Sequence, residues 1–187
     1  YHHTAQTTGS EIGRVELYAG EFDSDGDVIG AVMGDFGSIL TATGTAFQSI
    51  DSEAGCVTLN SCTVANGVAV VGDPPGEVAY QVGQVRISDS LIGGDVTISV
   101  HCEWSWPYWC AVWLQHNTIT GGLHCCFYGY GSDFVLWPSH VRSNVVSGGT
   151  HFCQYGAGRR YVISHNDFVG GVTTPTPADS VYGNVAV

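Results

Sequence analysis

The sequence contains no lysine, and its 17 acidic residues face only five arginines in a chain of 187 residues. The formal net charge is −12, and charged residues make up only 12% of the chain. Because nucleic-acid phosphates are bound by clustered Lys and Arg, this balance argues against a nucleic-acid partner. No apolar run approaches the roughly 20 residues that a membrane helix needs, so membrane insertion is not expected.

Glycine, in contrast, is abundant, with 26 residues, and 44% of the chain is apolar. The glycines follow no collagen-like period, and they occur together with many Val, Ile, Thr and Tyr residues. This composition is typical of short strands joined by tight turns. The length and the apolar content suit one globular domain with a core. We therefore predict a single all-β domain over residues 1–187.

Seven cysteines indicate an oxidising compartment. Their number is odd, so at least one thiol is free, bound to metal or paired with another chain. The chain begins at Tyr1 rather than Met, and we expect that it is a fragment or that a secretion signal has been removed. An extracellular location follows as an expectation: secreted, on a cell surface or on a virion.

The stretch from Val112 to Gly171 repeats itself. Its copies are VWLQHNTITGGLHCCFYG, HVRSNVVSGGTHFCQYG and YVISHNDFVGG, so each has apolar residues, an Asn, another apolar residue and a Gly pair. Equivalent positions, separated by 18 to 28 residues, are Cys62, Ser90, Asn117, Asn144, Asn166 and Asn184. Such spacings are expected of the coils of a solenoid. The Asn column is expected at a bend, where Asn tolerates unusual backbone angles and its amide can bond to the next coil.

Apolar residues keep the same columns across these units. The column three residues before the Asn column contains Leu59, Ile87, Leu114, Val141, Ile163 and Val181. The column two residues after it contains Val64, Ile92, Ile119, Val146, Phe168 and Ala186. Columns of this kind predict side chains that stack inside a tube, coil upon coil, about 4.8 Å apart.

With these columns, residues 56–187 resemble a right-handed parallel β-helix of the pectate-lyase-like superfamily, whose coils often carry an Asn at the turn after an apolar strand. The resemblance implies a solenoid of roughly 7–8 coils, less regular over residues 1–55 and regular over 56–187. That superfamily contains lyases, hydrolases, epimerases, phage tailspikes and adhesins. The resemblance therefore implies a fold and leaves the activity open.

Two insertions, at 103–110 and 129–138, lengthen successive units at equivalent points, so we expect both loops at one edge of the helix. Cys102 and Cys110 bracket the first insertion and could close it with a disulfide. The aromatic residues that would gather at this edge are Trp104, Trp106, Tyr108, Trp109, Tyr130 and Trp137. Aromatic faces stack on sugar rings and also bury well against protein. The edge could thus contact a glycan, contact a sister subunit or only cover the coil.

In the strand after each Gly pair, alternation places Leu123, Cys125 and Phe152 on the inner face. The residues expected to point outward are His124, Cys126, His151 and Cys153. Their arrangement on neighbouring coils allows three interpretations: a zinc or copper site, a Cys126–Cys153 cross-link, or an inert ladder. A register shift of one residue would turn all four inward. Zinc or copper is the only cofactor that the sequence suggests.

An enzyme would need acid, base and cationic groups at the loop edge. The candidates are Glu103, Asp133 and His101, with Arg159 assisting. The sequence lacks the Gly-His-Gly and Arg-x-Lys pattern of polygalacturonase-like hydrolases and the Asp-Pro-His motif of alginate epimerases. A structural or adhesive role is therefore favoured over polysaccharide cleavage or epimerisation.

Two further expectations concern the ends and an acidic stretch. The last residues form an apolar strand without a polar cap, which predicts a homo-oligomer through open ends or lateral packing, with sister subunits or a glycan as partner. Asp23, Asp25 and Asp27 alternate as in calcium loops, but the distal Glu of an EF-hand is absent, so an acidic turn is favoured.

Overall fold

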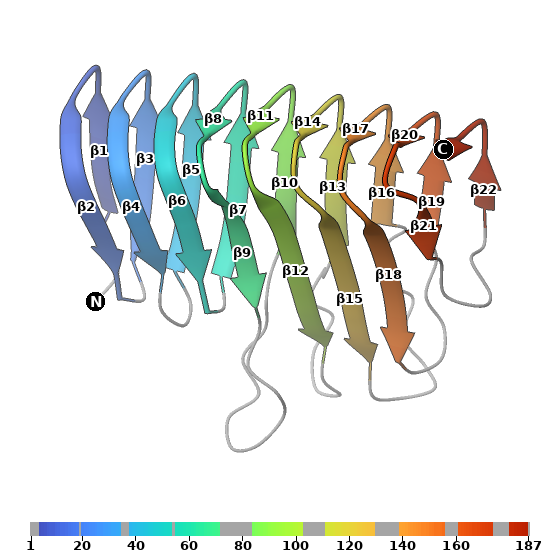
Figure 1. The fold of residues 1–187 in the computed structure, drawn as a ribbon. Helices are drawn as coiled ribbons and strands as arrows, with labels where there is room; N and C mark the ends of the chain where they lie inside the picture. The colour runs from blue at the N-terminus through green and yellow to red at the C-terminus, as the bar shows by residue number, and fades with distance from the viewer. Residues whose placement is uncertain are drawn as a thin grey trace.

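The structure, a computed structural model, describes residues 4–18, 20–34, 38–53, 55–71, 84–102, 111–129, 139–155, 161–173 and 180–186. All secondary structure elements in these ranges are β-strands, and none of the described residues belongs to a helix that could cross a membrane. The strands form one sheet of nine strands and one of fourteen, which face each other as two layers (Figure 1). All pairings are parallel, which confirms the all-β prediction and is consistent with a β-helix-like fold.

Successive strands alternate between the two sheets. The nine-stranded sheet contains β1 (Thr4–Thr8), β3 (Glu21–Asp25), β5 (Ser38–Thr43), β7 (Gly55–Asn60), β10 (Gln84–Ser88), β13 (Ala111–Gln115), β16 (Ser139–Arg142), β19 (Tyr161–Ser164) and β22 (Ser180–Tyr182). The fourteen-stranded sheet begins with three long strands, β2 (Glu11–Leu17), β4 (Val28–Gly34) and β6 (Ala46–Ser52). We define a repeat as one strand of the nine-stranded sheet together with the one or two strands that come next in the chain and belong to the other sheet.

In the fourth to eighth repeats the passage through the fourteen-stranded sheet is divided into two strands, and the ninth repeat has only the first of them within the described residues. The short first strands are β8 (Thr63–Val64), β11 (Leu91–Ile92), β14 (Thr118–Ile119), β17 (Val145–Val146), β20 (Asp167–Phe168) and β23 (Val185–Ala186). The second strands are β9 (Gly67–Val71), β12 (Asp95–Cys102), β15 (Leu123–Gly129), β18 (Thr150–Tyr155) and β21 (Val172–Thr173). Because β6 pairs with both β8 and β9, the division begins beside β6.

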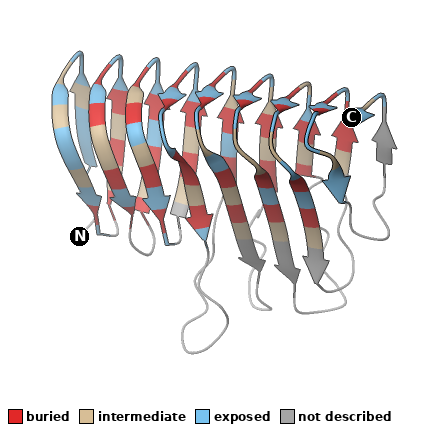
Figure 2. Cartoon of the chain, viewed as in Figure 1, coloured by how far each residue is buried: buried red, intermediate tan, exposed pale blue. Residues whose placement is uncertain are grey.

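Both predicted apolar columns are confirmed by the strand register. The first runs through the nine-stranded sheet from Leu59 to Val181, and the second runs through the short strands from Val64 to Ala186. In the central repeats their side chains are buried between the two sheets (Figure 2). Burial of one such aliphatic side chain stabilises the fold by about 1.5–3 kcal/mol, so the stacked columns form the core.

The Asn column is a hydrogen-bonded ladder at the bend between the two sheets. The N–H of Asn117 donates to Oδ1 of Asn144 at 3.0 Å, and the N–H of Asn144 donates to Oδ1 of Asn166 at 2.9 Å. Nδ2 of Asn144 also donates to the Leu114 carbonyl at 2.9 Å. The column is buried in these repeats. The expected hydrogen bonding of the Asn column between repeats is confirmed, but the expected unusual backbone angle is not at the Asn: the positive φ belongs to the residue before it, His116, Ser143 or His165.

The first three repeats continue the same ladder, although the sequence predicts that residues 1–55 are less regular. Their ladder residues are Ser10, Asp27 and Thr45, and the residue before each is a glycine with φ between 60° and 64°. These positions do not carry Asn, so the Asn pattern misses them. The described residues therefore contain nine repeats, where the sequence predicts seven or eight coils.

Asp27 belongs to this ladder and is buried. Its carboxylate accepts from the hydroxyls of Thr7 and Ser24 and from the N–H of Ser10, each at 2.6 Å. Burial acts to raise the pKa of Asp27, but the hydrogen bonds from Ser24, Thr7 and the N–H groups of Ser10 and Asp25 outweigh it and lower the pKa. Asp27 thus has a structural role at the turn between β3 and β4, whereas Asp23 and Asp25 belong to β3 itself and not to the predicted acidic turn.

Candidate functional site

The outer face of β12, β15, β18 and β21 carries the side chains that the sequence singles out. His124 and His151 are in register and exposed, and Cys126 and Cys153 are in register and half-buried. The intervening residues Leu123, Cys125 and Phe152 are buried, as predicted. The register is therefore the predicted one.

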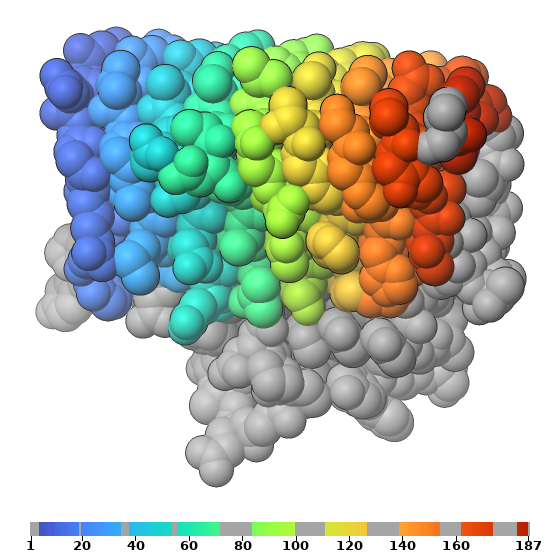
Figure 3. Space-filling view, viewed as in Figure 1, coloured from blue at the N-terminus to red at the C-terminus, as the bar shows by residue number. Residues whose placement is uncertain are grey.

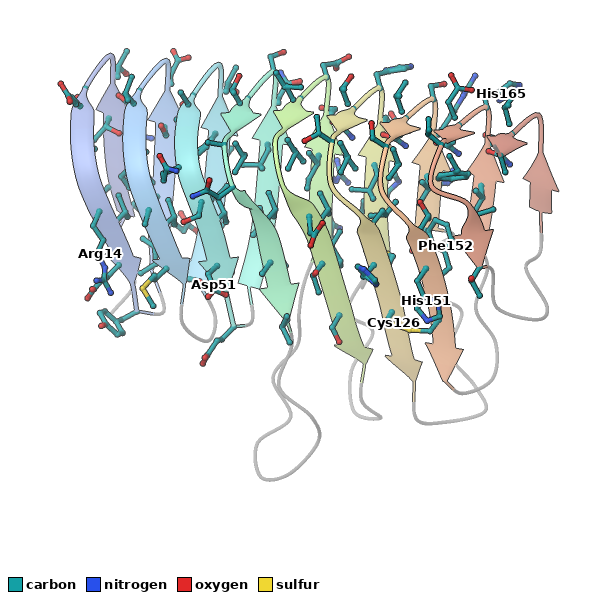
Figure 4. All side chains as sticks on the ribbon, in the orientation of Figure 1. Arg14, Asp51, Cys126, His151, Phe152 and His165 are labelled. Carbon is teal, nitrogen blue, oxygen red and sulfur yellow. A yellow bond between two sulfur atoms is a disulfide. The ribbon has the colours of Figure 1, made fainter. Side chains whose placement is uncertain are left out.

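A disulfide joins Cys126 to Cys153, with the two Cα atoms 4.5 Å apart (Figure 4). Adjacent strands hold these residues within the range that a disulfide requires. Of the three interpretations, the structure shows the cross-link. This corrects the zinc or copper site, since both sulfur atoms are bonded to each other and neither is available as a thiolate. Within the described residues no three His, Cys, Asp or Glu side chains converge as metal ligands.

A groove of about 640 Å³ opens beside this disulfide on the outer face of the same strands. Its floor consists of three successive glycine pairs, Gly121–Gly122, Gly148–Gly149 and Gly170–Gly171. The remaining lining residues are Asp95, His124, Thr150, His151, Val172 and Thr173. The two imidazole rings lie side by side, with centroids 6.3 Å apart. Figure 3 shows this side of the molecule, with the repeats side by side in chain order.

The glycines allow the groove because they bring backbone against backbone. A Cβ atom on Gly148 would lie 2.6 Å from the carbonyl carbon of Gly121, which no real side chain tolerates. A Cβ atom on Gly122 would lie 2.9 Å from the Gly149 oxygen. The floor therefore consists of backbone without side chains. The sequence shows the Gly pairs as part of the repeat but not the groove that they form.

One backbone group of the floor already binds a carboxylate. The N–H of Gly122 donates to Oδ1 of Asp95, which lies one repeat earlier, at 2.6 Å. Asp95 belongs to β12, and its Cα lies in the row of the sheet that continues with Gly122 and Gly149. The sequence did not single out Asp95, because it occupies a position that is glycine in the following repeats.

Most of the predicted catalytic and aromatic residues lie outside the described residues. They are Glu103, Trp104, Trp106, Tyr108, Trp109, Tyr130, Asp133, Trp137 and Arg159. The predicted Cys102–Cys110 disulfide is also untested, because Cys110 lies outside the described residues. The backbone of His101 lies in β12 and pairs with Tyr128 of β15. Both insertions follow directly on strands of the groove: Cys102 ends β12, and Gly129, the first residue of the predicted 129–138 insertion, ends β15 in register with it.

The outer face of the nine-stranded sheet presents a second cluster, which the sequence did not indicate. The guanidinium carbon of Arg86 lies 4.3 Å from the ring centroid of Trp113, and His140 is in register with Trp113. Burial and then the positive charge of Arg142 lower the pKa of His140. Because Arg86 covers a face of the indole, this cluster is a weaker candidate for stacking a ligand than the groove.

Comparisons with known proteins find no relative of this chain: no family model, no curated protein and no solved structure matches. The functional argument therefore rests on the groove and its surroundings.

Proposed function

We propose that this chain is an extracellular right-handed parallel β-helix, of the pectate-lyase-like kind, that binds a glycan chain along the groove in a structural or adhesive role. The observation that carries the proposal is the repetition of the groove itself. Glycine pairs from three successive repeats form its floor, and equivalent histidines from two repeats form its side. A site that repeats with the strand spacing of about 4.8 Å suits an elongated ligand that is itself a polymer.

The handedness, the superfamily and a coil count for the whole chain belong to this proposal. The apolar columns and the Asn ladder support them, since these features carry the resemblance to that superfamily. The extracellular location is supported by the disulfide between Cys126 and Cys153, because such bonds persist in oxidising compartments.

The aromatic insertions would extend the proposed binding surface. The strands that precede them, β12 and β15, are parallel and end in register, at one edge of the sheet. Their Trp and Tyr side chains would supply the stacking faces that sugar rings require, and they would equally suit a sister subunit in a homo-oligomer.

A polysaccharide-active enzyme is the second candidate. One observation favours it: His101 lies near the end of β12, the strand that begins with Asp95 of the groove, and Glu103 follows β12 in the sequence. Asp133 and Arg159 would complete the acid, base and cationic groups of such a site.

The test of the proposed function is binding to a panel of neutral and acidic polysaccharides, measured by affinity electrophoresis and calorimetry. We expect the wild type to bind at least one polysaccharide and the His124→Ala/His151→Ala variant to bind it about tenfold more weakly, as expected for the loss of two polar contacts. His116→Ala is the matched control, because His116 is an exposed histidine in another part of the fold.

Two other outcomes would change the conclusion. If the wild type binds no polysaccharide, or if both variants bind like the wild type, the groove is not a glycan site. The release of reducing ends or an unsaturated product that absorbs ultraviolet light would instead establish the enzyme.

A further inference from the structure

The outer face of the nine-stranded sheet separates its charges by sign. Within the described strands of this sheet, every acidic residue belongs to β3: Glu21, Asp23 and Asp25. Every arginine belongs to β10 or β16: Arg86 and Arg142. The strands between β3 and β10, which are β5 and β7, contain no charged residue. The face therefore has an acidic end and a basic end, although the chain as a whole carries a net charge of −12.

These side chains point away from the other sheet, because the residues that alternate with them are buried: Phe22, Ser24, Val85, Ile87 and Val141. The two ends also match row by row. Asp23 and His140 lie in one row of the sheet, and Asp25 and Arg142 lie in the next row. Both aspartates belong to the second strand of the sheet, and both basic residues belong to the seventh.

The charges at the two ends are available to a partner. Asp25 and Arg142 are exposed, and within the described part of the chain neither side chain forms an ion pair. Between the two ends, half-buried Ile39, Cys56 and Trp113 lie on the same face, and Arg86 covers the indole of Trp113. Trp and Arg at the centre with charged groups around them are the composition of a protein–protein interface.

We propose that the outer face of the nine-stranded sheet binds the same face of a second copy of this chain, in a two-fold dimer whose axis runs parallel to the strands between β7 and β10. A two-fold interface uses one patch on both copies, so every contact occurs twice. This axis keeps each row opposite itself and places β3 of one copy opposite β16 of the other. Asp25 then faces Arg142, and Asp23 faces His140, at both ends of the interface.

The extent of the overlap indicates a weak dimer. Strands β1 to β19 of each copy would overlap. At a spacing of about 4.8 Å and a length of about 17 Å, they cover on the order of 600 Å² per partner. Standard interfaces bury about 800 Å² per partner, so we expect a dissociation constant in the micromolar range. The net charge of −12 opposes association at long range, but about 0.15 M salt screens it beyond about 8 Å.

The dimer does not depend on the proposed glycan-binding function. The groove belongs to the fourteen-stranded sheet, and the two sheets form the two layers of the molecule, so the groove and the dimer face lie on opposite sides (Figure 1). If the groove also binds a glycan, the dimer would present one groove on each of its outer sides. It could then hold two polymer chains at once.

Charge-reversal variants test the dimer by sedimentation equilibrium at micromolar protein concentrations and about 0.15 M salt. We expect Asp25→Arg and Arg142→Asp each to weaken dimerisation at least about tenfold, because each places like charges together at both symmetric contacts. An equimolar mixture of the two variants should dimerise like the wild type. In the mixed dimer the new arginine faces the new aspartate, and the unchanged Asp25 and Arg142 face each other.

Asp51→Arg is the matched control, since it makes the same change of charge at an exposed residue of β6, on the other sheet (Figure 4). It should dimerise like the wild type. Circular dichroism should show that all variants fold, as expected for substitutions at exposed positions. A wild type that stays monomeric would overturn the proposal without any variant. Single variants that dimerise like the wild type, or a mixture that stays monomeric, would overturn it as well.

Discussion

Asn144 occupies the centre of the ladder, and its side chain joins three repeats. Its Oδ1 accepts from the N–H and Nδ2 of Asn117, and its Nδ2 donates to Leu114 and Asn166. An unsatisfied buried polar group costs about 1–3 kcal/mol, so we expect Asn144→Ala to lower the free energy of unfolding by about 3 kcal/mol. Urea unfolding followed by circular dichroism measures the change. Asn184→Ala, at a half-buried position of the last repeat, should cost clearly less; equal costs would contradict the ladder's role.

Cys125 is fully buried next to the disulfide, and burial raises the pKa of its thiol from 9.0 to about 12. Between these pH values the unfolded chain loses the proton that the folded chain keeps, so stability should fall as the pH rises from about 9 to about 12. Unfolding midpoints across this range should decline less steeply for Cys125→Ala. At pH 8.5, iodoacetamide should modify the half-buried Cys56 in the folded protein and leave Cys125 unmodified. Modification of both at equal rates would contradict this burial.

Single residues were predictable from the sequence where the fold repeats one residue type. The Asn column and the inner face around Cys125 are confirmed because periodicity alone determines them. The ladder residues Asp27 and Thr45 were not predicted, since the position needs any short polar side chain that accepts a hydrogen bond. Asp95 was missed for a related reason: its role depends on a glycine N–H one repeat away, which no local pattern shows.

At the scale of elements, the Cys126–Cys153 disulfide connects β15 to β18 across a sequence separation of 27 residues. The chain-entropy model assigns a loop of this length about 3–4 kcal/mol. We expect Cys126→Ser/Cys153→Ser to lose about that much stability in guanidinium unfolding. A reducing agent should lower the stability of the wild type to that of the double variant and leave the double variant unchanged. A wild type that reductant does not destabilise would show that the bond contributes nothing.

The strand order was predictable, and the division of the strands was not. The Gly pairs mark the point where β14 ends and β15 begins, but a Gly pair in sequence is equally compatible with a loop. The bend between the first and second strand of such a repeat, as between β14 and β15, follows from backbone contacts between repeats. One example is the contact of Gly148 with Gly121, and these contacts depend on register. The groove could therefore not be predicted from the sequence, whereas the outward direction of His124 and His151 could.

At the scale of the whole molecule, each described strand pairs only with strands of neighbouring repeats. Stability in such proteins is a sum of nearest-neighbour terms, so the ends should open before the middle. We expect amide hydrogens of β1 and β23 to exchange with deuterium first, and those of β10 and β13 last, as measured by mass spectrometry of peptides. Uniform exchange across all repeats would indicate one cooperative unit and contradict this expectation.

The overall architecture was largely predictable, because the parallel columns of a repeat protein depend on period and not on detail. The extent of the regular region was underestimated: repeats one to three carry Gly9, Gly26 and Gly44 before the ladder, and their strands lack the Gly pair. The function was less accessible, since a binding surface made of backbone leaves few residue types to recognise.

The division of the strands beside β6 has a consequence for the length of ligand that the groove can bind. The first three repeats run through the fourteen-stranded sheet without interruption, and only later repeats supply paired glycines to the floor. Each such repeat lengthens the floor by one strand spacing of about 4.8 Å. Duplication or loss of one repeat would then change the length of polymer bound in the groove by one strand spacing. The contacts made by each repeat would stay the same.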